Sequence, residues 1–251
     1  MLSDSYQADY SSILPGAVYD FSSRERKAKT VLAVLKDRLG DTLPRLRLLD
    51  TGASTGIIAN FLAPHFDLVA GIDIDTAAVA FARKTFSQPN LCLQAGDCMH
   101  IPHAANAFDV VVCNHVYEHV PDAGRLMKEI RRVLKPGGWC YFAAGNRLGV
   151  MEPHYGLPFL SWLPRPIAHR YMQLAGRGNC YYEKHLSLWG LQQLASGFRC
   201  VDYTRKVIAA PHVFHAGYML PAGSPKTAAA RLIARRAYWL LPTYIWMLQK
   251  P

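Results

Sequence analysis

Between residues 21 and 145 the hydrophobic positions follow two spacings that alternate along the chain. In four segments apolar residues recur every three or four positions, as on one face of a helix: 21–39, 57–64, 77–86 and 123–134. Short apolar runs, typical of strands covered on both faces, occur between and after them: 46–50, 68–73, 91–95, 108–113 and 139–144. Strands that alternate with helices predict an α/β fold with a parallel, doubly wound sheet.

After Gly145 the alternation stops for about forty residues and then returns. Residues 146–186 hold four prolines among many aromatic residues, a stretch too long for an ordinary connection. We expect an inserted element there, helical over 167–174. Beyond it, the pattern predicts helices at 188–195 and 225–240 and strands at 198–207 and 244–248, the last strand antiparallel.

The charge of the chain is concentrated in its second part. The formal net charge is +10. Residues 1–150 are nearly balanced, whereas residues 151–251 hold 12 Lys and Arg against 3 Asp and Glu, with 15 of the 28 aromatic residues. Such a surface suits an anionic partner, namely a phosphorylated substrate, an acidic membrane or nucleic acid. A solvated basic face over core aromatics is the alternative that this composition leaves open.

Targeting and cysteine signals are weak. The first residues carry Asp4 and Asp9 and lack an apolar segment, so we expect no secretory signal. The run from Tyr238 to Leu248 is broken by Pro242 and is too short for a membrane span. The six cysteines form no C-x-x-C pair, which predicts buried free thiols in a reducing compartment and no structural zinc.

The chemistry-bearing motif is the turn Asp50-Thr51-Gly52-Ala53-Ser54-Thr55-Gly56, which follows the first strand and opens a helix. Glycines there let the backbone approach a ligand, and the helix start offers free N–H groups. Asp73 ends the second strand, where an acid can accept ribose hydroxyls, and Gly96-Asp97-Cys98 ends the third. Phe108-Asp109-Val110-Val111, Glu118-His119-Val120 and Val133-Leu134-Lys135-Pro136-Gly137-Gly138 complete the series.

In this order the motifs resemble those of the class I S-adenosylmethionine-dependent methyltransferases, over residues 45–145. The dinucleotide-binding alternative requires G-x-G-x-x-G, a spacing that is absent here. A serine, Ser54, stands where the family often has a third glycine. The resemblance implies S-adenosylmethionine as cofactor and S-adenosylhomocysteine as product, with Asp50 and Gly52 at the methionine end, Asp73 at the ribose and Asp97 with Cys98 at the adenine. The expected cofactor-binding set is Asp50, Gly52, Ala53, Gly56, Asp73, Ile74, Asp97, Cys98 and Asn114.

Acceptor-side candidates follow the fourth strand. If residues 114–119 are helical, His115, Glu118 and His119 share one face. The segment resembles the Glu-x-x-Glu-His stretch of the ubiquinone-biosynthesis O-methyltransferases, which is associated with a divalent ion, but His115 replaces the first Glu. A packing role, a general base and a divalent metal stay open, and we assign no metal ligand. The catalytic candidates are His115, His119 and His154, and Tyr155 and His185 are further polar residues of the insertion region.

We therefore expect one methyltransferase domain over residues 1–251, with a cofactor-binding core at 45–145, a lid or membrane-docking insertion at 146–186 and the rest of a seven-stranded sheet at 187–251. Asn146-Arg147 matches the pair that begins the insertion of the ubiquinone enzymes, and residues 1–30 should close over the cofactor. The leading hypothesis is methylation of a hydroxyl on an apolar, lipid-linked or glycan-related acceptor, by a cytoplasmic enzyme peripheral to the inner membrane surface. The alternatives are a soluble metabolite or sugar beneath a lid, RNA, and a non-catalytic binding protein.

Overall fold

The computed structural model describes residues 8–13 and 15–251. Within them, seven strands form one sheet in the order β3-β2-β1-β4-β5-β9-β8. Their bounds are β1 Arg47–Thr51, β2 Leu68–Asp73, β3 Leu91–Ala95, β4 Phe108–Asn114, β5 Leu134–Gly145, β8 Arg199–Asp202 and β9 Thr243–Gln249. The first five strands run parallel, and β9 lies antiparallel between β5 and β8. The predicted Rossmann-like, seven-stranded α/β fold is thus confirmed.

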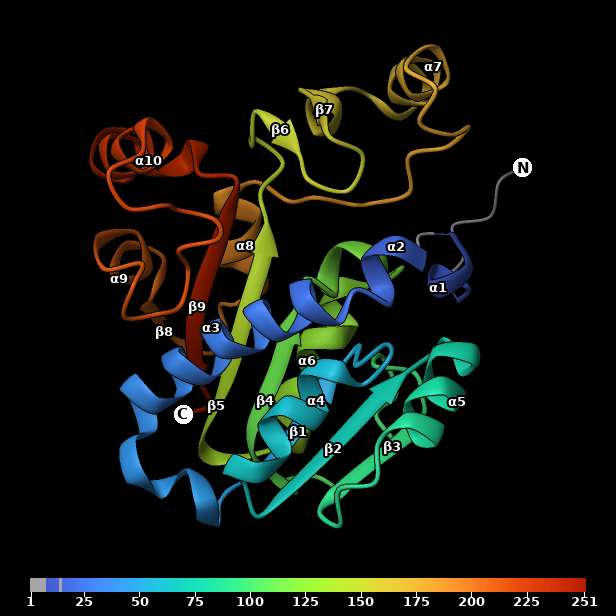
Figure 1. The fold of residues 1–251 in the computed structure, drawn as a ribbon, viewed down its shortest axis with the longest axis vertical. Coiled ribbons are helices and arrows are strands. Elements are labelled where there is room, and N and C mark those ends of the chain that lie inside the picture. The colour runs from blue at the N-terminus through green and yellow to red at the C-terminus, as the bar shows by residue number, and fades with distance from the viewer. Residues whose placement is uncertain (1–7, 14) are drawn as a thin grey trace.

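Helices cover both faces of this sheet (Figure 1). On one face lie α3 (Phe21–Leu39), α4 (Ile57–Leu62) and α5 (Thr76–Thr85), and on the other α6 (Ala123–Val133), α8 (Leu188–Leu194) and α10 (Pro225–Arg236). Two short helices, α1 (Tyr10–Ile13) and α2 (Pro15–Val18), precede α3, and a third, α9 (Thr204–Ala209), follows β8. Asp20, Asp75 and Asp122 cap α3, α5 and α6 by accepting backbone N–H groups.

The central strand β4 shows why its sequence is a continuous apolar run. Val110 and Val112 are fully buried in the cluster that includes Leu35 of α3, whereas Val111 belongs to the cluster that includes Leu126 of α6. Since successive side chains of a strand point to opposite faces, a strand with helices on both sides buries apolar side chains on both of its faces. Each such side chain contributes about 1.5–3 kcal/mol.

The insertion lies above the carboxyl ends of the parallel strands (Figure 1). It consists of the hairpin β6 (Met151–Glu152) and β7 (Leu157–Pro158), a turn at Leu160–Trp162, and α7 (Arg165–Leu174). A small core holds it together: Leu157, Leu160, Ala168, Met172 and Tyr181. The helix expected at 167–174 is therefore present, beginning two residues earlier. Within the part of the chain described, no helix is both long and apolar enough for a membrane span.

Three expectations need correction. The strand predicted at 198–207 ends at Asp202, because the Asp202 carboxylate accepts the N–H of Thr204 and begins α9. The helix predicted to reach residue 240 ends at Arg236, followed by a 3-10 turn. Finally, Cys92 and Cys200 are exposed rather than buried, because they lie on β3 and β8, the edge strands of the sheet. All six cysteines are free, and Cys98, Cys113 and Cys140 are buried as expected.

Candidate functional site

The turn after β1 is tight because three of its residues adopt left-handed backbone conformations. Gly52, Ser54 and Gly56 have φ angles of 71°, 52° and 71°. Ser54 accepts this strained conformation at the position where the resembled family often has glycine. A Cβ on Gly52 would lie 2.7 Å from a methyl group of Val116, so the turn lies directly against the segment that follows β4.

Asp73, at the end of β2, is tied to this turn. Its Oδ2 accepts the N–H of Ser54 at 2.7 Å, and its Oδ1 accepts the N–H of Asp75 at 2.8 Å. Burial raises the pKa of Asp73, while these two hydrogen bonds act in the opposite direction. Each carboxylate oxygen keeps a second lone pair, so the geometry is compatible with the predicted ribose contact.

Asp50 is the buried acid of the turn. Its side chain is fully enclosed, and its Oδ2 has no hydrogen-bond partner among the described residues. Burial raises the pKa of Asp50 to about 7, against the opposing charge of Arg24 in α3. An orphaned carboxylate oxygen of this kind is costly unless a ligand satisfies it. The site therefore fits a group that carries a positive charge or hydrogen-bond donors.

The N-terminal segment reaches the same place. The backbone N–H of Ser11 donates to Asp75 at 2.8 Å, and Thr55 donates to the carbonyl of Val18 at 2.9 Å. Arg24 interacts electrostatically with Asp50 and Asp73 at the turn, and with Tyr10, which in turn lies near the acids of the acceptor side, Glu118, Glu152 and Glu183. We did not predict Arg24 or Tyr10 from the sequence, because no local spacing links them to Asp50. These contacts agree with the expected closure by residues 1–30, of which 1–7 and 14 lie outside the described residues.

The remaining cofactor candidates line the same edge of the sheet. Asp97 accepts the N–H of Met99 at 2.6 Å and pairs with His100 at 3.0 Å, and the neighbouring Cys98 is buried. Asn114 ends β4, and Ile74 follows β2, both half-buried. The nine predicted residues thus lie at or just after the carboxyl ends of four adjacent strands, β1 to β4. Their contacts with a cofactor remain a prediction.

Residues 114–119 are not the helix that we considered. His115 has a φ of 56°, and only Tyr117–His119 form a single 3-10 turn. His115 and Glu118 nevertheless meet, with 3.0 Å between Nδ1 and Oε1. Burial alone would raise the pKa of Glu118, but the hydrogen bond from His115 and the nearby charges of His119 and His185 lower it to about 2. Glu118 is therefore a buried carboxylate whose hydrogen bond to Nδ1 fixes the orientation of the His115 ring.

His119 and His154 face each other across the base of the insertion. Their ring centroids are 5.0 Å apart with the planes nearly perpendicular, and the ring centroid of Tyr10 lies 5.1 Å from that of His119. Burial lowers the pKa of His119 to about 4. Glu183, which we did not predict, lies 3.9 Å from His119 and accepts the hydroxyl of Tyr155. The sequence did contain a hint of Glu183: residues 146–186 are basic overall and include only two acids, Glu152 and Glu183.

The Glu-x-x-Glu-His donor arrangement is not reproduced. His115 turns its Nδ1 toward Glu118, and its Nε2 lies 3.4 Å from the hydroxyl of Thr243. The stretch therefore does not direct three donors at one ion. Glu118 and His119 instead come within 4.8 Å of His154.

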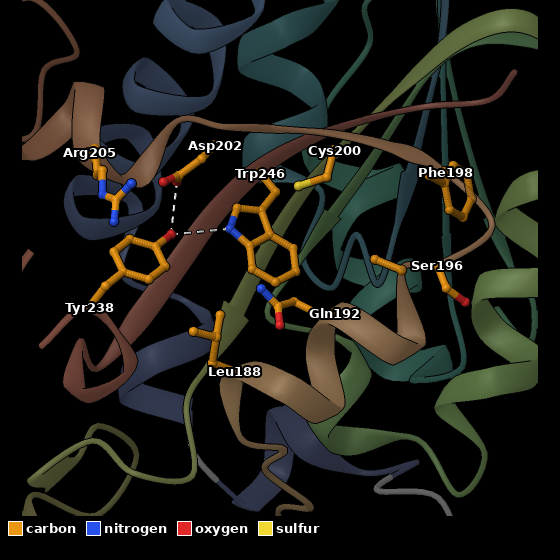
Figure 2. Close-up of a pocket in the computed structure, with 10 residues that line it drawn as sticks. Leu188, Gln192, Ser196, Phe198, Cys200, Asp202, Arg205, Tyr238 and Trp246 are labelled. Carbon is orange, nitrogen blue, oxygen red and sulfur yellow. Dashed lines mark hydrogen bonds between the residues drawn. The ribbon is translucent and has the colours of Figure 1, made fainter.

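A cavity of about 380 Å³ lies elsewhere, between α8 and the strands β8 and β9. Figure 2 shows Tyr238 donating to Asp202 at the rim, beside Trp246. None of the predicted site residues lines this cavity. It is therefore separate from the site at the carboxyl ends of the strands.

Comparisons with known proteins point to one class. Residues 49–142 match the family model of a methyltransferase domain. A ubiquinone biosynthesis O-methyltransferase of Coxiella burnetii is 32% identical over 108 residues, which are 42% of this chain and 46% of that protein. Its counterpart in Thiobacillus denitrificans is 34% identical over 128 residues, 47% of this chain and 54% of that protein. This chain thus spans about half the length of the curated relatives that it matches.

Solved structures share the fold. An S-adenosylmethionine-dependent methyltransferase of Mesorhizobium loti superposes with a TM-score of 0.58 at 15% identity, covering 88% of this chain and 97% of that one. A geranyl diphosphate C-methyltransferase of Streptomyces coelicolor gives a TM-score of 0.51 at 17% identity, covering 87% and 76%. At these identities the likeness concerns the fold alone.

Proposed function

Because residues 49–142 form a class I S-adenosylmethionine-dependent methyltransferase domain, we propose that this chain methylates a hydroxyl group of an apolar, lipid-linked or glycan-related acceptor. The observation that carries the proposal is the pair of His115 and buried Glu118, which follows β4 directly beside the cofactor turn. The sulfonium of S-adenosylmethionine supplies an electrophilic methyl group when bound. The chain itself has to bind, align the acceptor, exclude water and remove a proton.

The cofactor contacts that we propose follow the strand ends. The unsatisfied Oδ2 of Asp50 suits the ammonium of the methionine moiety, and Arg24 close by suits its carboxylate. Gly52, Ala53 and Gly56 bring the backbone against the ligand, with Asp73 and Ile74 at the ribose. Asp97 and Cys98 hold the adenine, and Asn114 lies between cofactor and acceptor.

His115 is the general base in this proposal. Glu118 accepts from Nδ1, which leaves the lone pair of Nε2 for an acceptor hydroxyl, the arrangement used by nucleophile–base–carboxylate systems. The hydroxyl oxygen forms a bond to the methyl carbon, the carbon–sulfur bond breaks with its electron pair left on sulfur, and the proton passes to Nε2. The left-handed backbone of His115 is strain of the kind that functional sites hold.

The acceptor class is inferred from the surface of the insertion. Apolar side chains are exposed there: Val150, Met151, Phe159, Trp162, Ile167 and Leu174. Arg147, Arg165, Arg170 and Arg177 are exposed among them, whereas the two acids of residues 146–187, Glu152 and Glu183, are buried. An apolar surface with basic residues and no exposed acid suits an anionic lipid interface. A soluble metabolite or sugar under a lid is the second candidate, favoured by the polar side chains of His119, His154 and Glu183 beneath the insertion.

A methyl-transfer assay with labelled S-adenosylmethionine tests both the lipid-linked and the soluble acceptor. The purified protein is incubated with methyl-labelled S-adenosylmethionine and a whole-cell extract, which is then divided into organic and aqueous phases. The proposal expects label in the organic phase, released by treatments that cleave O-methyl groups, and labelling slower by at least about tenfold with His115→Gln. Label confined to the aqueous phase supports the soluble acceptor, and absence of any transfer contradicts both.

A further inference from the structure

Three side chains of the insertion region form a compact group beside the His115–Glu118 pair. Glu152 ends β6, His154 follows two residues later, and His185 lies on the segment that returns to the sheet. Oε1 of Glu152 lies 2.7 Å from Nδ1 of His154 and 3.3 Å from Nε2 of His185. We name these residues the Glu152 triad. Their side chains are enclosed, with exposures of 0%, 13% and 2%.

The geometry points to a divalent transition-metal site formed by the Glu152 triad. The donor atoms of the three residues lie within 4.8 Å of one another. Ligands on a four-coordinate ion, with bonds of about 2.0–2.1 Å, are separated by about 3.3 Å. The Glu152–His185 distance already has this value, and the Glu152–His154 distance must open by about half an ångström. The ion would replace the protons of two existing hydrogen bonds.

The donor types select the metal. Two imidazoles and one carboxylate are the set that zinc and non-haem iron sites use, with a further position open. Magnesium and calcium prefer oxygen ligands with several waters. The triad therefore suits a zinc-like ion, in contrast to the carboxylate-rich stretch of the resembled enzymes.

An unsatisfied ring nitrogen supports this inference. Nδ1 of His185 is buried and has no hydrogen-bond partner among the described residues, and the same holds for Oε2 of Glu118. A Cβ on Gly145 would lie 2.8 Å from His185 Nδ1 and 3.6 Å from Glu118 Oε1, so both side chains lie next to the backbone of Gly145. A metal-bound histidine commonly donates its other N–H to a carboxylate. With an ion on Nε2, the Nδ1 of His185 carries a proton, and the buried carboxylate of Glu118, which interacts electrostatically with His185, is the candidate acceptor.

The carboxylate of Glu152 is already oriented for metal binding. Oε2 of Glu152 accepts the backbone N–H groups of His154 and Tyr155 at 2.9 and 2.8 Å, so Oε1 keeps its direction. Two ligands come from the start of the insertion and one from its end. An ion would therefore join both ends of the insertion above β5, which rigidifies the cover of the acceptor site. This inference does not depend on the proposed acceptor, because its readouts need no substrate.

A rival position shares His154. Glu118, His119 and His154 also lie within 4.8 Å of one another. An ion there would need His119 and not His185. Histidine-to-glutamine changes at positions 119 and 185 therefore form a matched pair that separates the two sites.

Cobalt and zinc titrations test the inference on the whole protein. After treatment with EDTA, the wild type should bind one Co²⁺ per chain, with visible absorption bands of a four- or five-coordinate ion, and Zn²⁺ should displace it. Bound Zn²⁺ should raise the melting temperature by several degrees, since it binds only the folded chain. His185→Gln and Glu152→Gln should weaken Co²⁺ binding at least a hundredfold, whereas His119→Gln should leave it within about threefold.

Folding of each variant is checked by circular dichroism and by S-adenosylhomocysteine binding. His185→Cys adds a readout for a variant that keeps a donor, because it should bind Co²⁺ with a new thiolate-to-metal charge-transfer band. No Co²⁺ binding by the wild type at millimolar concentration would overturn the inference and leave a hydrogen-bonded cluster only. Loss of binding in His119→Gln with retention in His185→Gln would equally overturn it.

Discussion

Nδ1 of His115 lies 3.0 Å from Oε1 of Glu118, whose side chain is completely buried. A carboxylate in this position fixes the tautomer of the imidazole and stabilises the imidazolium that forms when the ring takes up a proton. His115 keeps about a third of its side chain exposed, and its Nε2 lies 3.4 Å from the hydroxyl of Thr243, which itself donates to the carbonyl of Ala144. The pair has the geometry of a base with its orienting group.

Glu118→Gln tests the orienting role with little change in volume. The neutral amide keeps the shape but no longer stabilises an imidazolium, so we expect kcat to fall about 10- to 1000-fold with an unchanged Kd for S-adenosylmethionine. The kcat of His115→Gln should fall by about the same factor or more. With a phenolic acceptor, whose hydroxyl ionises at about pH 10, both losses should shrink at high pH, whereas with an alcohol or sugar hydroxyl they should persist. Single-turnover methyl transfer between pH 6 and 10 measures this.

Glu25→Gln, the same change on an exposed residue of α3, is the matched control and should behave as the wild type. If Glu118→Gln instead weakened cofactor binding and left kcat unchanged, the carboxylate would serve the cofactor turn and the base assignment would be wrong.

The sheet and the cofactor edge could be predicted from the sequence because their signals are local. β2 and β3 have the predicted bounds, since each is a short apolar run next to α5, whose start is fixed by the Asp75 cap. Asp109 shows why two of the motifs occur together. Its carboxylate accepts hydrogen bonds from Lys135 at 2.8 Å and from the backbone N–H of Arg47 at 3.0 Å, and so joins β4 to β5 and β1. The position of such a residue follows from the strands that it joins.

The acceptor side could not be predicted in the same way. Glu152 and His185 are 33 residues apart, and only the folding of the insertion brings them together. Arg24 reaches Asp50 from a helix whose amphipathic pattern carries no sign of a ligand. Periodicity alone allowed a helix over residues 114–119, but the left-handed backbone of His115 is incompatible with it. Contacts between residues far apart in the sequence, and strained backbone conformations, produce no periodic pattern of hydrophobic residues.

Asp50 should make stability depend on pH. Its pKa is about 7 in the folded protein, whereas the unfolded carboxyl titrates near 4, so between these values the folded state holds one more proton. The contribution of Asp50 to stability therefore falls as the pH rises from about 4 to about 7. We expect Asp50→Asn to remove this fall and to be more stable than the wild type at pH 8, by at most about 4 kcal/mol. Urea unfolding at pH 5 and pH 8 measures it.

The same substitution should weaken cofactor binding about 10- to 100-fold, because a charged hydrogen bond to the ammonium is lost. Exposed Asp41 supplies the control, Asp41→Asn, which should change neither property. An Asp50→Asn protein with the pH dependence of the wild type would show that another group is responsible.

Gly52→Ala should separate backbone strain from steric contact. The φ of 71° costs an alanine about 1 kcal/mol, and its Cβ would lie 2.7 Å from Val116 Cγ2. We expect weaker cofactor binding, by about tenfold or more, and a lower free energy of unfolding. Adding Val116→Ala removes the steric contact, so the double variant should recover part of the loss relative to Val116→Ala alone, and the remainder measures the backbone term. Full recovery would show that the left-handed conformation carries no cost here.

Charge reversal on the insertion tests the lipid interface. Arg170 and Arg177 are exposed, and each basic residue near an anionic membrane contributes about 1 kcal/mol. Arg170→Glu with Arg177→Glu should therefore reduce binding to phosphatidylserine-containing liposomes by at least about thirtyfold in a flotation assay at 0.15 M salt. Lys36→Glu with Lys128→Glu, the same charge change on α3 and α6, should reduce it far less, because these helices lie along the sheet rather than above it (Figure 1). Equal losses in the two variants would assign binding to net charge alone, and wild-type protein that ignores the liposomes would leave the insertion as a lid over a soluble acceptor.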